Sequence, residues 1–314
     1  QTWRPPRAGR TAKGKAIVNI LPIEPGVSVA ALMPVDAPEL EWDNLQVVFA
    51  TSEGDVRRNA LSDFTNIMRN GKIAMKLPDD DVLLVTRVGR AIRFPTTDVR
   101  VFKGRDSTGV RGVKLAEGDE VVSMAVIRHT EATPEERVAY IRMKRAMEGQ
   151  VEEDQAEVAD DEDGVEAGSL STERYAEMSA LEDLLLTVTS KGLGKLTSSY
   201  DYPVRGRGGM GVRATDAAMR GGPLVAVFPV ERSDQVMLVT SSGQSIRIPV
   251  EGIRFMARSG GGVRVLNLSG SEEEIVSVAR IAEAAEEDVI GAEATAETAA
   301  PEGSSPPDAG AMDA

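Results

Sequence analysis

The stretch Leu84–Phe94 reads Leu-Val-Thr-Arg-Val-Gly-Arg-Ala-Ile-Arg-Phe and contains the pattern that decides the fold. An apolar strand runs into a Thr-x-x-Gly turn, and a second apolar strand follows the turn. The same kind of turn recurs at residues 51–54, 189–192 and 240–243. Recurrence of one hairpin pattern predicts a repeat protein, in which each unit buries its apolar face on its neighbours.

A second glycine follows each turn glycine by 17 to 20 residues, at Gly71, Gly109, Gly211 and Gly262. These glycines lie in basic, glycine-rich segments, of which Lys103–Arg111 is the clearest. Because such a segment occurs once in each unit, we expect the assembled repeats to carry a cationic track. The natural ligand of a cationic track is a polyanion.

The fullest unit, at 81–127, holds four apolar segments in about 50 residues, which is the size of a propeller blade. We expect two strands beside the turn, a third at Gly112–Leu115 and a fourth at Val121–Ile127. Units at 183–230 and 233–281 keep this plan. The sequence therefore predicts an all-β fold, a β-propeller of repeated four-stranded blades whose ring is incomplete in this chain.

Two units depart from the plan. Residues 1–36 contain only a basic loop and the closing half of a unit, and the chain starts with Gln1, so we expect a fragment of a longer protein. The unit at 45–78 is shortened, because its turn glycine Gly54 lies only 35 residues before Gly89. We expect that blade to be incomplete or to borrow a strand. Residues 1–127 and 181–281 then form the first part and the last two blades of the propeller.

Residues 128–180 interrupt the repeats. Thr133, Pro134 and Glu136 fit the N-cap, N1 and N3 positions of a capping box and predict a helix over 133–147. A second short helix is expected over 172–181. Residues 148–166 are acidic and lack apolar periodicity, which predicts disorder, and the acidic tail at 282–314 is expected to be disordered as well.

The charge distribution favours a nucleic acid partner despite a net charge of −14. Residues 128–180 and 282–314 hold all of the excess acid, and the repeats themselves are slightly basic. Local charge decides phosphate binding. We expect the DNA-binding residues to be the cations of the repeated loops: Arg10, Lys13, Lys15, Arg69, Lys72, Lys76, Arg100, Lys103, Arg105, Arg111, Lys114, Arg205, Arg207, Arg213, Arg258 and Arg264.

Nothing in the sequence points to catalysis, a metal or a cofactor. Cysteine is absent, which is typical of a reducing cytosol, and no apolar run is long enough to span a membrane. His129 stands at the start of the insert, where a surface position is expected. The Gly206-x-Gly208-x-x-Gly211 pattern lacks the helix and the acidic residue of a dinucleotide site. We expect this chain to have no chemistry of its own.

The units resemble the C-terminal domain of the A subunit of DNA gyrase. The resemblance rests on the hairpin Val85–Phe94, the loop Thr108–Gly112 and the segment Leu115–Val122, which follow one another in the order typical of that family. It implies a β-pinwheel whose blades exchange strands with their neighbours. It also implies a rim that wraps double-stranded DNA for an ATP-driven type IIA topoisomerase introducing negative supercoils. The implied partners are the rest of gyrase A and the gyrase B protein in an A2B2 complex, located in the cytoplasm at the nucleoid.

The chain departs from that family at its signature heptapeptide, Gln-Arg-Arg-Gly-Gly-Lys-Gly. The nearest match is Arg205–Gly211, which lies in a later unit and has Met210 at the lysine position, so we interpret it as an ordinary blade loop. The tyrosines, of which there are four, lack the context of the topoisomerase nucleophile. Two alternatives stay open at this point: the corresponding subunit of topoisomerase IV, and a propeller that binds proteins rather than DNA.

Overall fold

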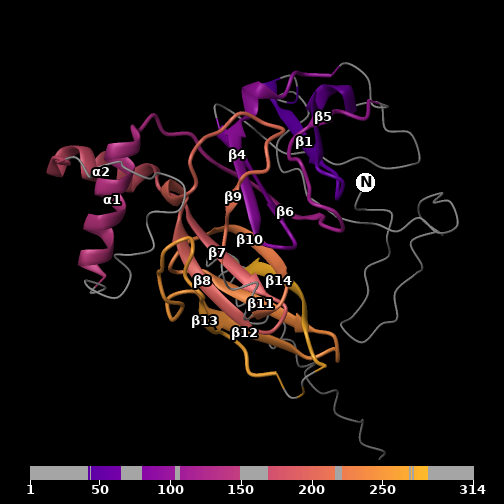
Figure 1. Cartoon of the computed structure of the whole chain (residues 1–314), viewed down its shortest axis with the longest axis vertical. Helices are drawn as coiled ribbons and strands as arrows, with labels where there is room; N and C mark the ends of the chain where they lie inside the picture. Colours follow the sequence, from indigo (N-terminus) through magenta and orange to yellow (C-terminus); the bar gives the residue numbers. More distant parts are fainter. Residues whose placement is uncertain are drawn as a thin grey trace, which may run out of the picture.

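The computed structural model describes residues 42, 44–64, 80–102, 107–148, 169–215, 221–268, 270 and 272–281. Within these residues, four antiparallel sheets follow one another along the chain, and each sheet contains the hairpin of one sequence unit (Figure 1). The all-β propeller prediction is therefore confirmed. The expected partial unit at 1–36, most of the acidic stretch at 148–166 and the tail at 282–314 lie outside the described residues.

Each sheet is built around the hairpin of its own unit. The first sheet has, in spatial order, β1 (Gln46–Ala50), β2 (Asp55–Ala60) and β5 (Val110–Arg111). The second has β6 (Val121–Arg128), β3 (Asp80–Thr86), β4 (Arg90–Pro95) and β9 (Val212–Arg213). The third has β10 (Leu224–Val230), β7 (Leu184–Thr189), β8 (Leu193–Ser198) and β13 (Val263–Arg264). The fourth has β12 (Ser245–Pro249), β11 (Gln235–Thr240) and β14 (Ile275–Ile281).

The short strands β5, β9 and β13 belong to a different unit from the sheet that they complete. Each one comes from the basic loop of one unit and pairs with the second hairpin strand of the preceding unit, β2, β4 or β8. Among the described residues, β12 has no strand of this kind on its outer edge. We call the three contacts the β2/β5, β4/β9 and β8/β13 junctions.

The structure corrects one predicted strand. Gly112–Leu115 is not a strand, and the strand of that loop is β5, two residues earlier. The amides of Gly112 and Val113 both donate to the carbonyl of Gly54 in the preceding unit, so this segment closes the junction rather than forming a hairpin with β6. The unit at 45–78 contributes β1, β2 and a short 3-10 helix, η3 (Leu61–Phe64), to the described residues, and borrows β5 from the next unit.

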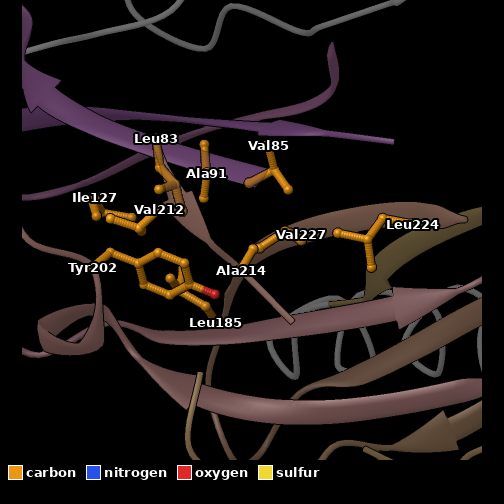
Figure 2. Close-up of a cluster of buried hydrophobic side chains, with 11 residues drawn as sticks. Leu83, Val85, Ala91, Ile127, Leu185, Tyr202, Val212, Ala214, Leu224 and Val227 are labelled. Carbon is orange, nitrogen blue, oxygen red and sulfur yellow. The ribbon is translucent and has the colours of Figure 1, made fainter. Parts of the chain in front are cut away.

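The hydrophobic core lies between consecutive sheets. One cluster joins the second and third sheets, with Leu83, Val85 and Ile127 on one side and Leu185 and Val227 on the other (Figure 2). Similar clusters join the first sheet to the second and the third to the fourth. Valine, leucine and isoleucine fill these layers, because β-branched and aliphatic side chains fit stacked pleated surfaces.

The insert forms two helices beside the third sheet, α1 (Pro134–Met147) and α2 (Thr172–Leu181) (Figure 1). Thr133 caps α1 through a complete capping box with Glu136. Tyr140 of α1 stacks on Tyr175 of α2, with ring centroids 4.8 Å apart. Tyr140 also meets Tyr200 edge-on, and this contact ties the helices to η5 (Ser199–Asp201) of the third unit.

Candidate nucleic-acid interface

Three arginines occupy the same position in three successive junctions. Arg111, Arg213 and Arg264 are the second residues of β5, β9 and β13, and all three side chains are exposed. They lie opposite Asp55, Arg90 and Leu193, which are themselves equivalent positions in the three hairpins. One exposed guanidinium therefore recurs at each of the three junctions along the series of sheets.

The loop glycines make this arrangement possible. Gly109, Gly211 and Gly262 precede the three short strands and have φ angles of 90°, 68° and 77°. A side chain at Gly211 would clash with the carbonyl of Ala91, and one at Gly109 would clash with that of Val56. Because glycine tolerates a positive φ and has no Cβ, the basic loop lies directly against the backbone of the preceding unit.

Arg90 and Arg213 form a pair that sequence reasoning missed. They face each other directly across β4 and β9, and both are exposed. Like charges directly opposite each other on neighbouring strands destabilise a sheet unless a counter-ion neutralises them. Arg90 follows the turn glycine in an ordinary hairpin, so the hairpin pattern alone gives no sign of its role. Its partner becomes visible only when the pairing of β9 is known.

Other predicted loop cations are placed on the surface. Arg100, Lys114 and Arg205 are exposed, and the guanidinium of Arg100 lies 4.4 Å from the ring centroid of Phe102. Arg207 and Arg258 instead direct donors to backbone carbonyls of the preceding unit. The remaining predicted residues lie outside the described parts of the chain: Arg10, Lys13, Lys15, Arg69, Lys72, Lys76, Lys103 and Arg105.

The interface also contains a buried cation that the sequence did not reveal. Lys195 of β8 is 1% exposed, and its Nζ donates to the carbonyls of Ala257 and Gly260 at 3.0 and 2.9 Å, and to that of Arg258. These carbonyls belong to the basic loop of the last unit. Burial raises the pKa of the nearby Asp201 carboxyl, and the charges of Arg145, Arg258 and Lys195 oppose that shift.

The remaining candidate groups have structural environments. His129 is partly buried, and its Nδ1 lies 2.9 Å from a carboxylate oxygen of Asp81, so it is not the plain surface residue that we expected. Burial raises the pKa of every tyrosine phenol in the chain, which is the wrong direction for a nucleophile: Tyr140, Tyr175, Tyr200 and Tyr202.

The described ranges contain no cluster of three or more residues suited to a metal ion. Within the same ranges, neither helix has the length and apolar character needed to cross a membrane.

Comparison with known proteins identifies the family. The family model described as "DNA gyrase C-terminal domain, beta-propeller" matches residues 6–36, 46–84, 80–128, 183–231 and 234–282. The chain belongs to this family. The matched ranges coincide with the repeat units and leave out the helical insert and the acidic tail.

Relatives in the family support the assignment. The chain is 44% identical to the A subunit of DNA gyrase of Granulibacter bethesdensis over 96% of its own length, and 39% identical to that of Rickettsia bellii over 91%. The Escherichia coli protein of the same name is 29% identical over 92% of the chain. These alignments cover 35%, 32% and 28% of the relatives, so the chain spans about a third of their length.

Solved structures show the same fold. The C-terminal domain of DNA topoisomerase IV matches with a TM-score of 0.62 and 19% identity, covering 90% of this chain and 76% of that one. The DNA gyrase A C-terminal domain matches with a TM-score of 0.56 and 18% identity, covering 86% and 76%. At these identities the likeness establishes the fold, whereas the sequence relatives favour gyrase over topoisomerase IV.

Proposed function

We propose that this chain is the DNA-binding and DNA-wrapping domain of a DNA gyrase A protein. The observation that carries the proposal is the recurrence of Arg111, Arg213 and Arg264 at one register of three successive junctions. Guanidinium groups bind phosphate without reading base sequence, so a regular series of them suits a bent duplex. The Arg90–Arg213 pair supports the same function, because a bound phosphate relieves its repulsion.

In this proposal the chain binds and bends the DNA, and the rest of the enzyme carries out the reaction. Phosphates of double-stranded DNA follow the basic loops from one junction to the next, which bends the duplex around the edge of the sheets. The rest of gyrase A and the gyrase B protein, in an A2B2 complex, would use ATP to introduce negative supercoils into the DNA that is wrapped on this chain. Such a complex would act in the cytoplasm, at the nucleoid. The chain itself would need no cofactor.

Salt-dependent binding tests the proposal. Wild-type affinity for duplex DNA should fall steeply with salt, by about 0.9 log unit per log unit of salt for each phosphate contact. Replacing Arg111, Arg213 and Arg264 together by alanine should reduce that slope by about 3 without changing sequence preference. Arg142→Ala, at an exposed position on α1, is the matched control and should leave the slope unchanged.

The same experiment separates the alternatives. A protein-binding propeller would show affinity that hardly depends on salt, and the triple variant would behave like the control. A domain of the topoisomerase IV type would bind duplex DNA with the expected salt dependence and would wrap it weakly. Wrapping is measured by relaxing a closed circular plasmid in the presence of the chain and determining the change in linking number.

A further inference from the structure

One arginine in each of two successive loops reaches back to the loop before it. Arg207 lies four residues before Gly211, and its Nη1 donates to the carbonyl of Arg111 at 3.1 Å. Arg258 lies four residues before Gly262, and its Nη1 donates to the carbonyl of Arg213. Both acceptors are equivalent, because Arg111 and Arg213 each stand two residues after a loop glycine. The same side-chain contact therefore recurs at two junctions.

The contact at Arg207 is reinforced on both sides. Its Nε donates to the carbonyl of Asp98 at 3.0 Å, so the guanidinium binds two carbonyls of the preceding unit. The amide of Gly208 donates to the carbonyl of Gly112 at 2.6 Å, and the amide of Lys114 donates to the carbonyl of Gly209 at 2.8 Å. These bonds fix the distance between one basic loop and the next.

Arg258 is held in a similar way by different atoms. Lys195 donates to the carbonyls of Ala257, Arg258 and Gly260, so the backbone on both sides of this arginine is fixed to β8. The planar guanidinium presents donors in a rigid fork, which an ammonium group does not reproduce. A lysine at either position would keep the positive charge and lose the geometry of the contact.

We propose that Arg207 and Arg258 are positioning residues that set the spacing between the DNA-contacting arginines of successive loops. This inference rests on the proposed function. It divides the loop arginines into two classes. An arginine at the second position after the loop glycine contacts phosphate, whereas an arginine at the fourth position before the glycine binds a carbonyl of the preceding loop. We call the second kind of contact a clasp. The clasps matter for a duplex that contacts several loops at once and have little effect on one that contacts a single loop.

Charge-preserving variants of the whole chain test this division. Arg207→Lys combined with Arg258→Lys should bind a duplex of about 10 bp, one helical turn, within about twofold of wild type and with an unchanged salt slope. Its affinity for a duplex of about 40 bp, four turns, should fall at least tenfold. Arg142→Lys, at an exposed position on α1 outside the basic loops, is the matched control and should bind both duplexes like wild type.

Hydrogen exchange provides a readout that is independent of DNA. In the free protein, Arg207→Lys should accelerate exchange of the Gly208 amide, which bonds to Gly112, while Arg111→Lys should leave it unchanged. Unaltered exchange in Arg207→Lys would overturn the proposal, even if the double variant were unstable. Equal losses on short and long duplexes, or no loss on either, would also overturn it. Absence of binding by the wild-type chain would refute the proposed function itself and leave the exchange result to decide on the clasp.

Discussion

The β4/β9 and β8/β13 junctions have the same backbone and different interiors. In both, the short strand pairs at the start of the acceptor strand, and a parallel bridge follows, Arg93 with Val204 in one and Leu196 with Phe255 in the other. The carbonyls of Arg93 and Leu196 accept equivalent backbone bonds, at 2.8 Å in each case. The junction is therefore defined by backbone register, and the side chains that fill it are free to differ.

The differences are chemical. At the β4/β9 junction, buried Arg93 binds Asp81 at 2.6 Å and donates to the carbonyls of Ser199 and Arg128. At the β8/β13 junction, the positions equivalent to Asp81 and Arg93 are occupied by Leu184 and Leu196. The position equivalent to Ile92 is occupied by Lys195, which donates to carbonyls of the basic loop. Two solutions to the same packing problem indicate that the hairpin and the loop glycine specify the repeat, and that no fixed set of buried side chains does so.

The largest effect is expected from breaking the buried ion pair of the β4/β9 junction. Arg93→Leu copies the other junction but leaves Asp81 buried without its guanidinium partner, which should reduce the free energy of unfolding by about 4 kcal/mol. Adding Asp81→Leu removes the buried carboxylate that has lost its guanidinium partner, so the double variant should be more stable than Arg93→Leu alone. Denaturant unfolding measures both; a double variant less stable than Arg93→Leu would contradict the explanation.

The reciprocal exchange at the β8/β13 junction should have the next largest effect. Lys195→Ile installs the side chain of the equivalent position, Ile92, and removes the donor from three loop carbonyls. Unsatisfied buried acceptors should lower the free energy of unfolding by about 3 kcal/mol. Lys191→Ala, which breaks a solvent-exposed ion pair with Glu274, is the control and should cost less than about 1 kcal/mol. Similar losses for both variants in denaturant unfolding would show that the carbonyl contacts are unimportant.

The loop glycines provide a smaller contrast between the junctions. Alanine at Gly211 or Gly262 must adopt a positive φ, which costs about 1 kcal/mol. Only at Gly211 does the new Cβ collide with a carbonyl, that of Ala91, while at Gly262 the nearest atom lies 3.1 Å away. Gly211→Ala should therefore lose about 1 to 2 kcal/mol more than Gly262→Ala. Thermal unfolding of the two variants tests this ranking, and the reverse order would be inconsistent with the close approach at β9.

The smallest effect concerns acid and the β8/β13 junction. Burial raises the pKa of Asp201, so the folded protein binds this proton more tightly than the unfolded chain, in which an aspartate has a pKa of about 3.9. Wild-type stability should then fall as the pH rises above about 4, until the folded carboxyl ionises. Asp201→Asn does not titrate, so its Tm relative to wild type should increase over that range. A relative Tm that decreases with rising pH would disprove the raised pKa.

The sequence predicted the features that depend on local pattern. Thr-x-x-Gly marked the hairpins, because the turn glycine needs a positive φ, and Gly89 and Gly192 have φ angles of 93° and 84°. Apolar segments beside these turns marked the strands, and the all-β fold class that they predicted is confirmed. The capping box placed a helix start at Thr133, and α1 begins at Pro134.

The sequence failed where pairing connects distant units. The resemblance implied strand exchange, but no local pattern shows that β9 pairs with β4, since Val212 and Arg213 make too short a strand to be recognised alone. For the same reason Arg90 was missed as a neighbour of Arg213. Lys195 sits in a strand whose pattern gives no sign of burial, because its acceptors lie more than sixty residues away along the chain.

Because a short strand from one sequence unit completes the sheet of the preceding unit, the boundaries of the sequence units do not coincide with the boundaries of the blades. The units at 81–127 and 183–230 each bring one acceptor edge for the unit after it and one donor strand for the unit before it. Tandem duplication of a whole unit adds one acceptor edge and one donor strand, so the number of unpaired edges in a linear series does not depend on its length. Loss of a whole unit from the interior also leaves that number unchanged. A break inside a unit, between its hairpin and its loop, exposes a row of unpaired backbone groups and invites association between chains.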